Sequence, residues 1–317
     1  MELRQLRYFV AIVDHGSLSR AALVLHVAQP ALTQQLRQLE DELGAQLLHR
    51  SAQGVLSTDA GKVFYQHAQA ILKQVADARS AVTQSTTRPS GSVTLGLPHS
   101  ISGALALPLL VAARATYPEI TLQLTEELTG NLTEQLKAGR INLAVLFDDG
   151  QLGAFDSAAL VEEALMFICR ADSAFRPGPG RRRTRVALAD ALAATLILPA
   201  QQQGVRPRID KVARSAGLSL GTVIEINSIA ILRSALLADM GATILPMAPL
   251  RAEIASGALQ AWPIHSPALS RSVTLCASRT IPLTNAAAAV GRLVHQVTRT
   301  LCAGGAWPGA TLLTPVQ

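Results

Sequence analysis

Amide, hydroxyl and guanidinium side chains gather on one short segment, residues 29–41, with the sequence QPALTQQLRQLED. On a helix, one face of this segment carries Pro30, Gln34, Arg37 and Asp41, and Gln29 and Thr33 lie near its start. Amides and guanidinium groups can form paired hydrogen bonds with base edges in the major groove of DNA, and a threonine hydroxyl can reach a base edge or a phosphate. The segment therefore has the chemistry needed to read a DNA sequence.

Two short helices are predicted to position these side chains. Leu32, Leu36, Leu39 and Leu43 step by four, three and four, which predicts one apolar stripe on the helix that carries them. Pro30 suits the first turn of this helix, where no backbone N–H is needed. A shorter stripe precedes it and can be capped by Ser17: Leu18, Ala21, Ala22 and Leu25. With residues 26–28 as a tight connection, the pair has the pattern of a helix-turn-helix, although an ordinary helical hairpin fits this spacing equally well.

The flanking segments predict the rest of a small domain. Residues 3–13 are expected to form an opening helix whose apolar side consists of Leu3, Leu6, Val10 and Val13. Gly44 ends the reading helix, and Gln46–His49 and Val55–Ser57 can then pair as a two-stranded wing.

A long helix is predicted to begin at Thr58 and Asp59, with a hydroxyl that can cap it and an acid in its first turn. Its apolar residues step alternately by four and three: Phe64, Ala68, Ile71, Val75, Ala78 and Val82. Such a heptad seam needs a partner surface, either the body of the same chain or the same helix of a second chain. We favour pairing between two chains, because helix-turn-helix proteins usually dimerise to read symmetric half-sites. The polar segment Gln84–Ser92, QSTTRPSGS, is expected to follow as a hinge.

From Val93 onward, short strands alternate with helices. The predicted strands of a first unit are residues 93–97, 120–124 and 142–147, and its helices are residues 103–116 and 130–139. A second unit from about residue 164 has predicted strands at 165–169, 195–198, 223–226 and 242–245 and helices near 205–216 and 229–239. This alternation is typical of parallel sheets covered on both faces. A strand at 271–278 and a helix at 285–302 are expected to return the chain to the first unit, and the small-residue tail from Ala303 is expected to fray.

The sequence resembles the LysR-type transcriptional regulators in order and in length. The similarity is strongest in HGSLSRAALVLHVAQPALTQQLRQLEDELGAQLLHR, residues 15–50, and in LSTDAG, residues 56–61. The phrases LRYFVAIVDHGSL, VLHVAQPAL and IEINSIAIL look most like the nitrogen-assimilation-control branch of that family. The resemblance implies an α+β multidomain protein with an N-terminal winged helix-turn-helix, a long linker helix and a C-terminal two-subdomain α/β fold of the type-2 periplasmic-binding-protein kind.

Domain boundaries follow from these patterns together. Residues 1–58 are expected to form the DNA-binding domain, and residues 59–90 the linker helix and hinge used for dimerisation. Residues 91–302 are expected to form an effector-binding regulatory domain, with subdomain I at about 91–163 and 268–302 and subdomain II at about 164–267. Residues 303–317 remain as the frayed tail.

Residue chemistry and resemblance together give nine candidate DNA-binding residues: Ser19, Arg20, Gln29, Pro30, Ala31, Thr33, Gln34, Arg37 and Arg50. Arg50 is the only cation of the wing, because this chain has Gln53 where family members usually carry a second arginine. The family's serine at the start of the reading helix is Ala28 here, which removes a cap worth about 0.5–2 kcal/mol. Both departures change the wing and the helix cap but leave the family resemblance intact.

Ligands of open α/β sheets gather beyond the carboxyl ends of strands, close to helix N-termini. That rule points to residues 98–102, 129–131, 199–204 and 227–228, and the resemblance places an effector pocket in matching positions. The candidate effector-binding residues are Ser100, Ile101, Ser102, Thr129, Asn131, Phe147, Gln203 and Ser228. Each hydroxyl or amide among them could equally be a plain helix cap. From the sequence alone no arginine points into this cleft, so a carboxylate effector is not required.

Enzyme activity has little support in the sequence. His99 and Ser100 could pair a base with a nucleophile, but sequence neighbours rarely face each other productively, and the chain has no G-x-S-x-G elbow, P-loop or G-x-G-x-x-G motif. The seven histidines lack metal spacing, and the three cysteines, Cys169, Cys276 and Cys302, are too far apart for a zinc site or a disulfide framework. We therefore expect no catalysis, no cofactor and no metal.

Bulk properties predict a cytosolic protein. The start Met-Glu-Leu-Arg-Gln has no signal-peptide pattern, and no uncharged run of about twenty apolar residues predicts a membrane span. The formal charge is +6, yet residues 1–92 hold nine basic and seven acidic residues, so most of the excess lies downstream. Part of it is the cluster Arg181, Arg182, Arg183 and Arg185, which we interpret as a solvated loop, with a phosphate contact as the alternative. Charge therefore does not identify the DNA-binding part; motif geometry does.

The expected function is sequence-specific DNA-binding regulation of transcription in response to a small-molecule effector or to metabolic state. The expected partners are double-stranded DNA, an unknown small molecule and further copies of this chain in a dimer or tetramer, with RNA polymerase as a further candidate. The alternative is a cytosolic solute-binding sensor without effector-gated DNA reading, which the C-terminal two-thirds alone would allow. The attached helix-turn-helix and the missing signal peptide favour the regulator.

Overall fold

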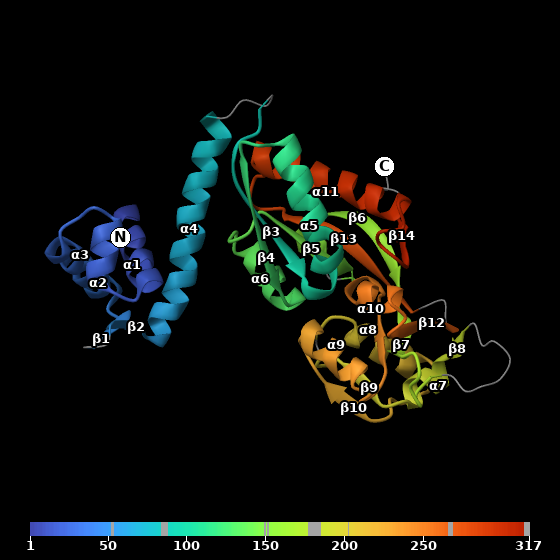
Figure 1. Ribbon diagram of the computed structural model, residues 1–317. Helices are drawn as coiled ribbons and strands as arrows, with labels where there is room; N and C mark the ends of the chain where they lie inside the picture. The colour runs from blue at the N-terminus through green and yellow to red at the C-terminus, as the bar shows by residue number, and fades with distance from the viewer. Residues whose placement is uncertain are drawn as a thin grey trace. The chain divides into compact units, whose positions relative to one another are not determined.

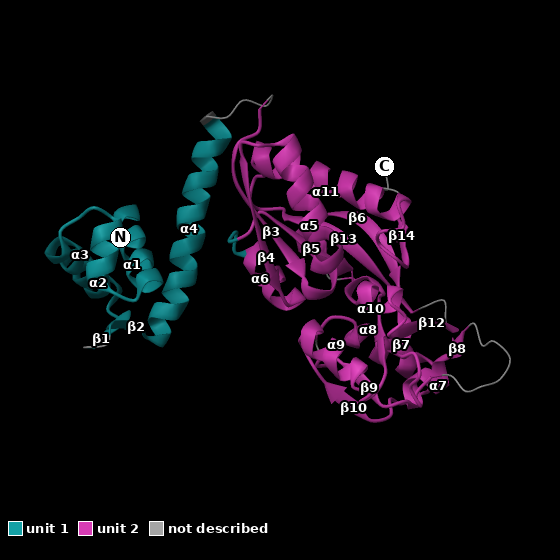
Figure 2. Ribbon diagram, viewed as in Figure 1, with its two compact units in different colours: residues 1–83, 138–140 teal, residues 84–137, 141–317 magenta. Residues whose placement is uncertain are grey.

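The computed structural model describes residues 1–51, 54–83, 88–148, 150, 152–176, 185–201, 203–265 and 269–313. The chain divides into two units (Figure 2): unit 1 comprises Met1–Thr83 with the short segment Ala138–Arg140, and unit 2 comprises Gln84–Lys137 with Ile141–Gln317. Across the described ranges, no helix has both the length and the apolar character needed to cross a membrane. Predictions for Gln53, for residues 84–87 of the hinge and for Arg181–Arg183 lie outside the described residues.

Unit 1 is a winged helix-turn-helix followed by a long helix (Figure 1). Its elements are α1 (Leu3–His15), α2 (Leu18–Val24), α3 (Gln29–Leu43), β1 (Leu48–Ser51), β2 (Gly54–Ser57) and α4 (Asp59–Thr83). β1 and β2 pair antiparallel, with Leu48 opposite Ser57 and Ser51 opposite Gly54. The predicted architecture is confirmed, and the first wing strand begins at Leu48 rather than at Gln46.

The apolar stripe of α3 faces the core of unit 1, as its spacing predicts. Leu32, Leu36 and Leu39 are buried, whereas Leu43 at the end of the stripe is 39% exposed. Gly44 ends the helix in the left-handed region, with φ +62°. The predicted Ser17 cap of α2 is confirmed, because its hydroxyl accepts a hydrogen bond from the Arg20 N–H at 3.4 Å.

The buried face of α1 differs from the predicted one. It consists of Leu6, Phe9 and Ile12, and Leu3 is 38% exposed. Phe9 turns inward because its ring meets that of Phe64 on α4 edge to face, with 5.2 Å between ring centroids. Of the predicted face, Leu6 is buried and Val10 and Val13 pack against the core as partly buried residues. The prediction missed Phe9 and Ile12 because the apolar residues of α1 fit two neighbouring faces, and a contact with a distant helix selects between them.

One part of unit 2 surrounds a six-stranded sheet with strand order β14-β6-β13-β5-β3-β4 (Figure 1). Its elements are β3 (Gly91–Pro98), α5 (His99–Thr116), β4 (Ile120–Glu127), α6 (Thr129–Lys137), β5 (Leu143–Asp148), η1 (Leu152–Ala154), β6 (Phe155–Ala164), β13 (Ser270–Ser278), α11 (Asn285–Ala303) and β14 (Ala310–Leu312). β3 pairs parallel with β4 and β5, but β13 pairs antiparallel with β5 and β6. Within this sheet, the parallel-sheet prediction therefore holds only for β3, β4 and β5. The periodicity does not predict β6, because Asp156, Glu162 and Glu163 interrupt its apolar residues.

Helices cover both faces of this sheet. Successive residues of a strand point to opposite faces. Leu143 and Val145 of β5 pack in the same cluster as residues of α5 and α11, and Ala144 and Leu146 pack with Leu132 of α6. This part of unit 2 is thus a three-layer α/β arrangement, with helices on both faces of the six-stranded sheet.

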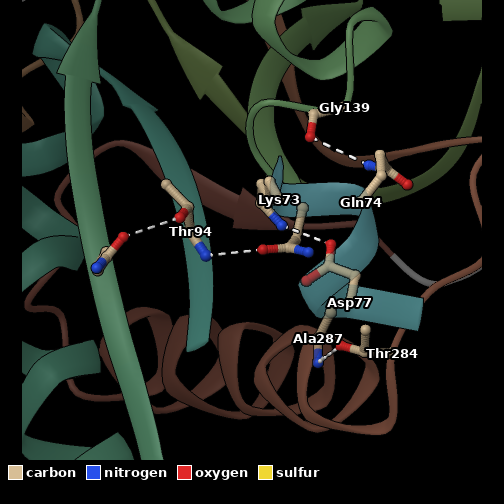
Figure 3. Close-up of polar contacts among 9 residues, drawn as sticks. Lys73, Gln74, Asp77, Thr94, Gly139, Thr284 and Ala287 are labelled. Carbon is tan, nitrogen blue, oxygen red and sulfur yellow. Dashed lines mark hydrogen bonds and ion pairs between the residues drawn. The ribbon is translucent and has the colours of Figure 1, made fainter. Parts of the chain in front are cut away.

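Helix α11 returns the chain to this sheet, as predicted. Thr284 caps the helix, because its hydroxyl accepts a hydrogen bond from the Ala287 N–H at 3.1 Å (Figure 3). Val290 and Val294 of the helix lie in the same buried cluster as Leu95 of β3.

The other part of unit 2 contains a four-stranded sheet of order β11-β7-β12-β8 and a parallel pair of β9 and β10. Its elements are β7 (Met166–Arg170), β8 (Val186–Ala187), α7 (Leu188–Ala193), β9 (Leu196–Leu198), α8 (Arg206–Ser215), β10 (Val223–Glu225), α9 (Ile229–Leu237), β11 (Thr243–Leu245), η2 (Ala248–Leu250), α10 (Arg251–Ala255) and β12 (Leu259–His265). The chain enters from β6 and leaves into β13, and the Leu165 N–H donates to the Leu269 carbonyl at 3.0 Å between these two crossings.

The C-terminal segment belongs to the fold, which corrects the predicted frayed tail. Trp307 is 2% exposed within the core of the six-stranded sheet, and β14 pairs antiparallel with β6. The prediction rested on the small residues and glycines of the segment, but one buried tryptophan outweighs them by the apolar area it removes from water. Residues 314–317 lie outside the described ranges.

Candidate functional site

The candidate DNA-binding residues of unit 1 lie together on α2 and α3. Seven of them are exposed, namely Ser19, Arg20, Gln29, Pro30, Ala31, Gln34 and Arg37, and Thr33 is half-buried. The Ser19 hydroxyl donates to Gln29 Oε1 at 2.9 Å, which joins the two helices at the start of α3. Among the described residues, Gln34 and Arg37 have no hydrogen-bond or ion-pair partner, so their polar groups are available to a ligand.

The turn between α2 and α3 is tight. His26 occupies the left-handed region with φ +54°, and the Val27 N–H donates to the Ala22 carbonyl at 3.0 Å. Ala28 stands at the N-cap of α3 and supplies no side-chain cap, as its identity predicts. Pro30 lies in the first turn, where its missing N–H leaves nothing unpaired.

Glu40 positions the wing, a role that the sequence analysis missed. Its Oε1 accepts hydrogen bonds from the N–H groups of Leu47 and Leu48 at 2.8 and 3.2 Å. Glu40 looks like one of several exposed acids at the end of α3, and only the folded chain brings the two amides to it. The side chain of Arg50 lies outside the part that the structure describes, and its DNA contact stays a prediction.

The first turn of α4 is fixed against the residues that precede the wing. The Thr58 hydroxyl accepts from the Gly61 N–H at 2.9 Å, which confirms the predicted cap, and it also approaches the Leu47 carbonyl at 3.1 Å. A Cβ atom on Gly61 would lie 2.0 Å from the Leu47 carbonyl oxygen. Glycine at this position is therefore required by a close approach of two backbone segments.

A polar bridge also joins α4 to α1. The Tyr65 hydroxyl donates to Asp14 Oδ1 and accepts from Gln69 Nε2 at 2.7 Å. Burial, and then the hydrogen bond to Asp14, raises the pKa of Tyr65 to about 12, so the phenol stays protonated as a donor at neutral pH. The first turns of α4 are thus part of the helix-turn-helix body.

This attachment corrects part of the predicted seam. Ala68 is fully buried and Phe64 packs on Phe9, so both face the chain's own core. Ile71 is 37% exposed and Val82 is 87% exposed. The Lys73–Asp77 ion pair, at 2.6 Å, lies between these two positions on the same helix (Figure 3). Only the later seam residues are therefore available to a second chain.

A small cavity of about 60 Å³ in unit 2 brings together several candidate effector residues. Ser100, Thr129, Phe147 and Gln203 line it. An adjoining cleft of about 870 Å³ shares Thr129 and Phe147 and is also lined by Asn131. Five of the eight candidates therefore surround one continuous region.

Three candidates do not reach either cavity. Ile101 is fully buried in the core, and the Ser102 hydroxyl donates to the His99 carbonyl at 3.1 Å. Ser228 is the N-cap of α9, because its hydroxyl accepts from the Ile231 N–H at 3.4 Å. Ser228 is thus the plain helix cap of the alternative interpretation, whereas the Ser102 hydroxyl donates within α5 and caps nothing.

Arg271 lines both cavities, which corrects the expectation that no arginine reaches the cleft. Its Nε and Nη2 atoms contact Glu163 Oε2 at 2.7 and 2.6 Å, and Nη2 also donates to Ser100 Oγ at 2.9 Å. Its guanidinium carbon lies 3.9 Å from the centroid of the Phe147 ring. Burial lowers the pKa of Arg271, and the neighbouring charge of Glu163 acts in the opposite direction.

Glu163 completes this buried network. It is fully buried, and its Oε1 accepts a hydrogen bond from Trp307 Nε1 at 2.8 Å. Glu163 and Arg271 are direct cross-strand partners in the antiparallel pair of β6 and β13. No local pattern could have revealed the pair, because 108 residues separate its members and the register is set only by folding.

A second buried arginine, Arg206, contacts the loop that carries Gln203. Arg206 is 7% exposed, and its Nε donates to Asp210 Oδ1 at 2.9 Å. Its Nη1 approaches the Pro199 carbonyl at 3.5 Å. This wall of the cavity is therefore tied to the first turns of α8.

Of the three cysteines, Cys169 and Cys276 are buried and Cys302 is half-buried. Burial raises the pKa of Cys169 and of Cys276 to about 12. A thiol of this kind holds almost no thiolate at neutral pH and is a poor nucleophile.

Comparison with known proteins finds matches for both halves of the chain. The description "Bacterial regulatory helix-turn-helix protein, lysR family" matches residues 3–62, and "LysR substrate binding domain" matches residues 86–299. The nitrogen assimilation regulatory protein nac of Escherichia coli (strain K12) is 38% identical over 300 residues, which cover 94% of this chain and 95% of that protein. The DNA-binding transcriptional dual regulator OxyR of the same strain is 30% identical over 246 residues, 78% of this chain and 79% of that protein.

Solved structures show the same fold. A full-length OxyR variant from Pseudomonas aeruginosa covers 99% of both chains with a TM-score of 0.71 at 21% identity. CbnR, a LysR family transcriptional regulator, covers 94% of this chain and 99% of its own with a TM-score of 0.67 at 23% identity. With both halves of the chain matched by LysR descriptions, this protein belongs to the LysR family of transcriptional regulators.

Proposed function

We propose that this protein binds double-stranded DNA through α3 and controls transcription from the sites it reads. The observation that carries the proposal is the exposed pair of Gln34 and Arg37, free of partners among the described residues and fixed over a buried leucine stripe. Full-length CbnR has been solved in complex with its target DNA, which supports the transfer of this partner to a chain of the same family. Acting on the bacterial chromosome places the protein in the cytoplasm, and we assign it no catalytic activity.

We further propose a division of labour along the chain. Residues 1–58 form the reading domain, residues 59–90 the linker, and residues 91–302 the effector-binding domain, with subdomain I at about 91–163 and 268–302 and subdomain II at about 164–267. The packing of Phe64 on Phe9 and the burial of Ala68 favour counting the first turns of α4 with the reading domain. The burial of Trp307 favours extending subdomain I past Ala303. Self-association runs through the later turns of α4.

Gln34→Ala is expected to weaken binding at the preferred DNA site by about 1–3 kcal/mol and to leave the affinity for random DNA almost unchanged. The reason is that a contact with a base edge depends on the DNA sequence. The measurement is a pair of binding titrations on specific and random duplexes. Gln38→Ala serves as the matched control, since Gln38 is also exposed on α3 but bonds to Gln35 at 2.9 Å. Equal losses on both duplexes for Gln34→Ala would show that another face of α3 reads the bases.

Arg50→Ala is expected to weaken binding to the specific and the random duplex by a similar factor, because a wing arginine contacts phosphate. The same variant should also show a flatter dependence of DNA affinity on salt concentration.

Ile71→Glu combined with Val75→Glu is expected to dissociate the oligomer at concentrations where the unmodified chain is paired, because each charge would have to be buried in the contact. Sedimentation of the full chain is the measurement. Gln66→Glu is the control, because it adds a charge to an exposed position elsewhere on α4. An unmodified chain that sediments as a monomer would remove the seam as an interface.

Ser100→Val is expected to keep DNA affinity but to lose the response to the effector. The substitution preserves volume, removes the hydroxyl that Arg271 Nη2 contacts at 2.9 Å and leaves a buried polar group unpaired, at a cost of about 1–3 kcal/mol. Promoter output is compared with and without effector in both forms. Ser102→Val is the matched control, because Ser102 lies in the same turn but lines neither cavity. A normal response in Ser100→Val would exclude Ser100 from the site.

The names of some relatives suggest a second candidate function, a response to hydrogen peroxide. Proteins named hydrogen peroxide-inducible genes activator match this chain, one of them at 29% identity over 275 residues. We do not transfer that response, because the buried thiols of Cys169 and Cys276 lack the thiolate character that reaction with peroxide requires.

A further inference from the structure

The guanidinium of Arg271 has two hydrogen-bonding edges, and the network uses them differently. The edge formed by Nε and Nη2 contacts Glu163 Oε2 at 2.7 and 2.6 Å. On the other edge, Nη2 donates to Ser100 Oγ at 2.9 Å, and no hydrogen bond from the described residues reaches Nη1. Arg271 lines both cavities, and Ser100, the partner of Nη2 on this second edge, lines the small one. The contact with Ser100 therefore directs the second edge, with its donors Nη1 and Nη2, toward the small cavity.

Trp307 occupies one of the two carboxylate oxygens of Glu163, so that the other contacts Arg271. The two carboxylate oxygens are divided, because Oε2 contacts Arg271 and Oε1 accepts the indole N–H of Trp307 at 2.8 Å. The indole therefore holds the carboxylate on one edge of the guanidinium and stabilises part of its negative charge. Arg271 keeps positive character toward the cavity, where the N-terminus of α5 adds to it at Ser100.

The opposite wall of the same cavity presents an acceptor. Gln203 Oε1 is buried and has no hydrogen-bond partner within the described part of the chain. Most of the remaining lining is apolar, including Phe147, Leu232 and Leu245, and its other polar residues are His99, Glu127, Thr129 and Asn227. Unpaired buried polar groups are rare in folded proteins unless something binds them.

We propose that Arg271 recognises a carboxylate group on the ligand of this cavity, and that Glu163 and Trp307 are positioning residues that keep its second edge free. The ligand class is a small carboxylic acid with an apolar body and one hydrogen-bond donor. The carboxylate occupies Nη1 and Nη2, and the Ser100 hydroxyl then donates to it; the ligand's donor reaches Gln203. This assignment rests on the proposed function, in which the cleft of unit 2 holds the effector.

Lactate and lactamide test the assignment, because they share an apolar methyl group and a hydroxyl donor and differ in the carboxylate. The chain has two tryptophans, so Trp262→Phe in the full chain leaves Trp307 as the sole indole emitter, bonded to Glu163. At matched ionic strength, lactate is expected to change this emission saturably with at least about a tenfold lower Kd than lactamide. Equal affinity for the two probes, or no saturable binding of either, would overturn the proposal.

Two further variants separate charge from folding. Glu163→Gln combined with Arg271→Gln replaces the ion pair with two amides, keeps an acceptor for Trp307 and avoids a lone buried charge. It is expected to fold, by circular dichroism, and to lose the preference for lactate when titrated by the same Trp307 emission. A folded double variant that still prefers lactate would contradict the role of Arg271.

Trp307→Phe keeps a ring in the core but removes the N–H that holds Glu163. Calorimetry is expected to show lactate binding about threefold to tenfold weaker than in Trp262→Phe, with lactamide unchanged. A parallel loss for both probes would reduce Trp307 to a packing residue and remove it from the proposal. DNA binding by the same preparations, measured without either probe, tests the proposed function separately.

Discussion

Arg271→Met is expected to lower the free energy of unfolding of unit 2 by about 3–5 kcal/mol, because it leaves the fully buried carboxylate of Glu163 without its partner charge. Urea denaturation followed by circular dichroism gives this value. Adding Glu163→Leu to the same chain is expected to restore most of the loss, since two apolar side chains can replace a buried ion pair at little net cost.

Arg279→Met provides the matched control for this measurement. Arg271 is the second residue of β13, and Arg279 directly follows the last residue of the same strand. Arg279 pairs with Asp156 at 3.1 Å, but both side chains are more than half exposed. Exposed pairs contribute about 0–1 kcal/mol, so its removal should hardly change stability. If Arg271→Met cost no more than Arg279→Met, water would have to reach Glu163, and the network would not be a sealed one.

Gly61→Ala is expected to destabilise unit 1 by about 3 kcal/mol and to weaken DNA binding with it. The added Cβ would lie 2.0 Å from the Leu47 carbonyl oxygen, and neither backbone segment can turn away as a side chain could. The same carbonyl accepts the Thr58 N–H at 2.9 Å, so displacing it also disturbs the start of α4. Thermal unfolding and a DNA titration of the full chain measure the two effects.

Gly103→Ala is the control for the glycine prediction. Gly103 lies inside α5, and a Cβ there would meet nothing within 4 Å. Alanine in a helix interior is favoured over glycine by roughly 1 kcal/mol, so this variant should be neutral or slightly more stable. Unchanged stability in Gly61→Ala would mean that α4 can shift away from Leu47. The reading domain would then be less rigid than these contacts indicate.

Short-range sequence patterns predicted the elements of the reading domain, residues 1–58, well. The spacing of Leu32, Leu36 and Leu39 gave the buried face of α3, and that face in turn placed Gln34 and Arg37 outside. Helical periodicity and capping are properties of a few neighbouring residues, so they can be read without the rest of the chain. The same reasoning gave the Thr58 cap, which the structure confirms.

The cleft was predicted in outline but not in chemistry. Helix N-termini and strand ends led to Ser100, Thr129 and Gln203, which line one cavity, because those positions follow from the order of elements in an α/β sheet. Arg271 was missed, since its approach to Ser100 joins residues 171 apart in the chain. Ser228 was included because a helix cap and a ligand contact use the same residue types.

By itself the sequence determined the helix-turn-helix pattern with its outward polar face and the alternation of strands and helices, which depend on local periodicity and turn chemistry. The family came from the resemblance of whole phrases of the sequence to known regulators. Tertiary structure alone decided which way Phe9 and Phe64 face, that Trp307 belongs to the core, and that Glu163 meets Arg271. Those outcomes depend on which distant surfaces meet and in what register, and a one-residue shift in register would turn each side chain of a strand to the other face.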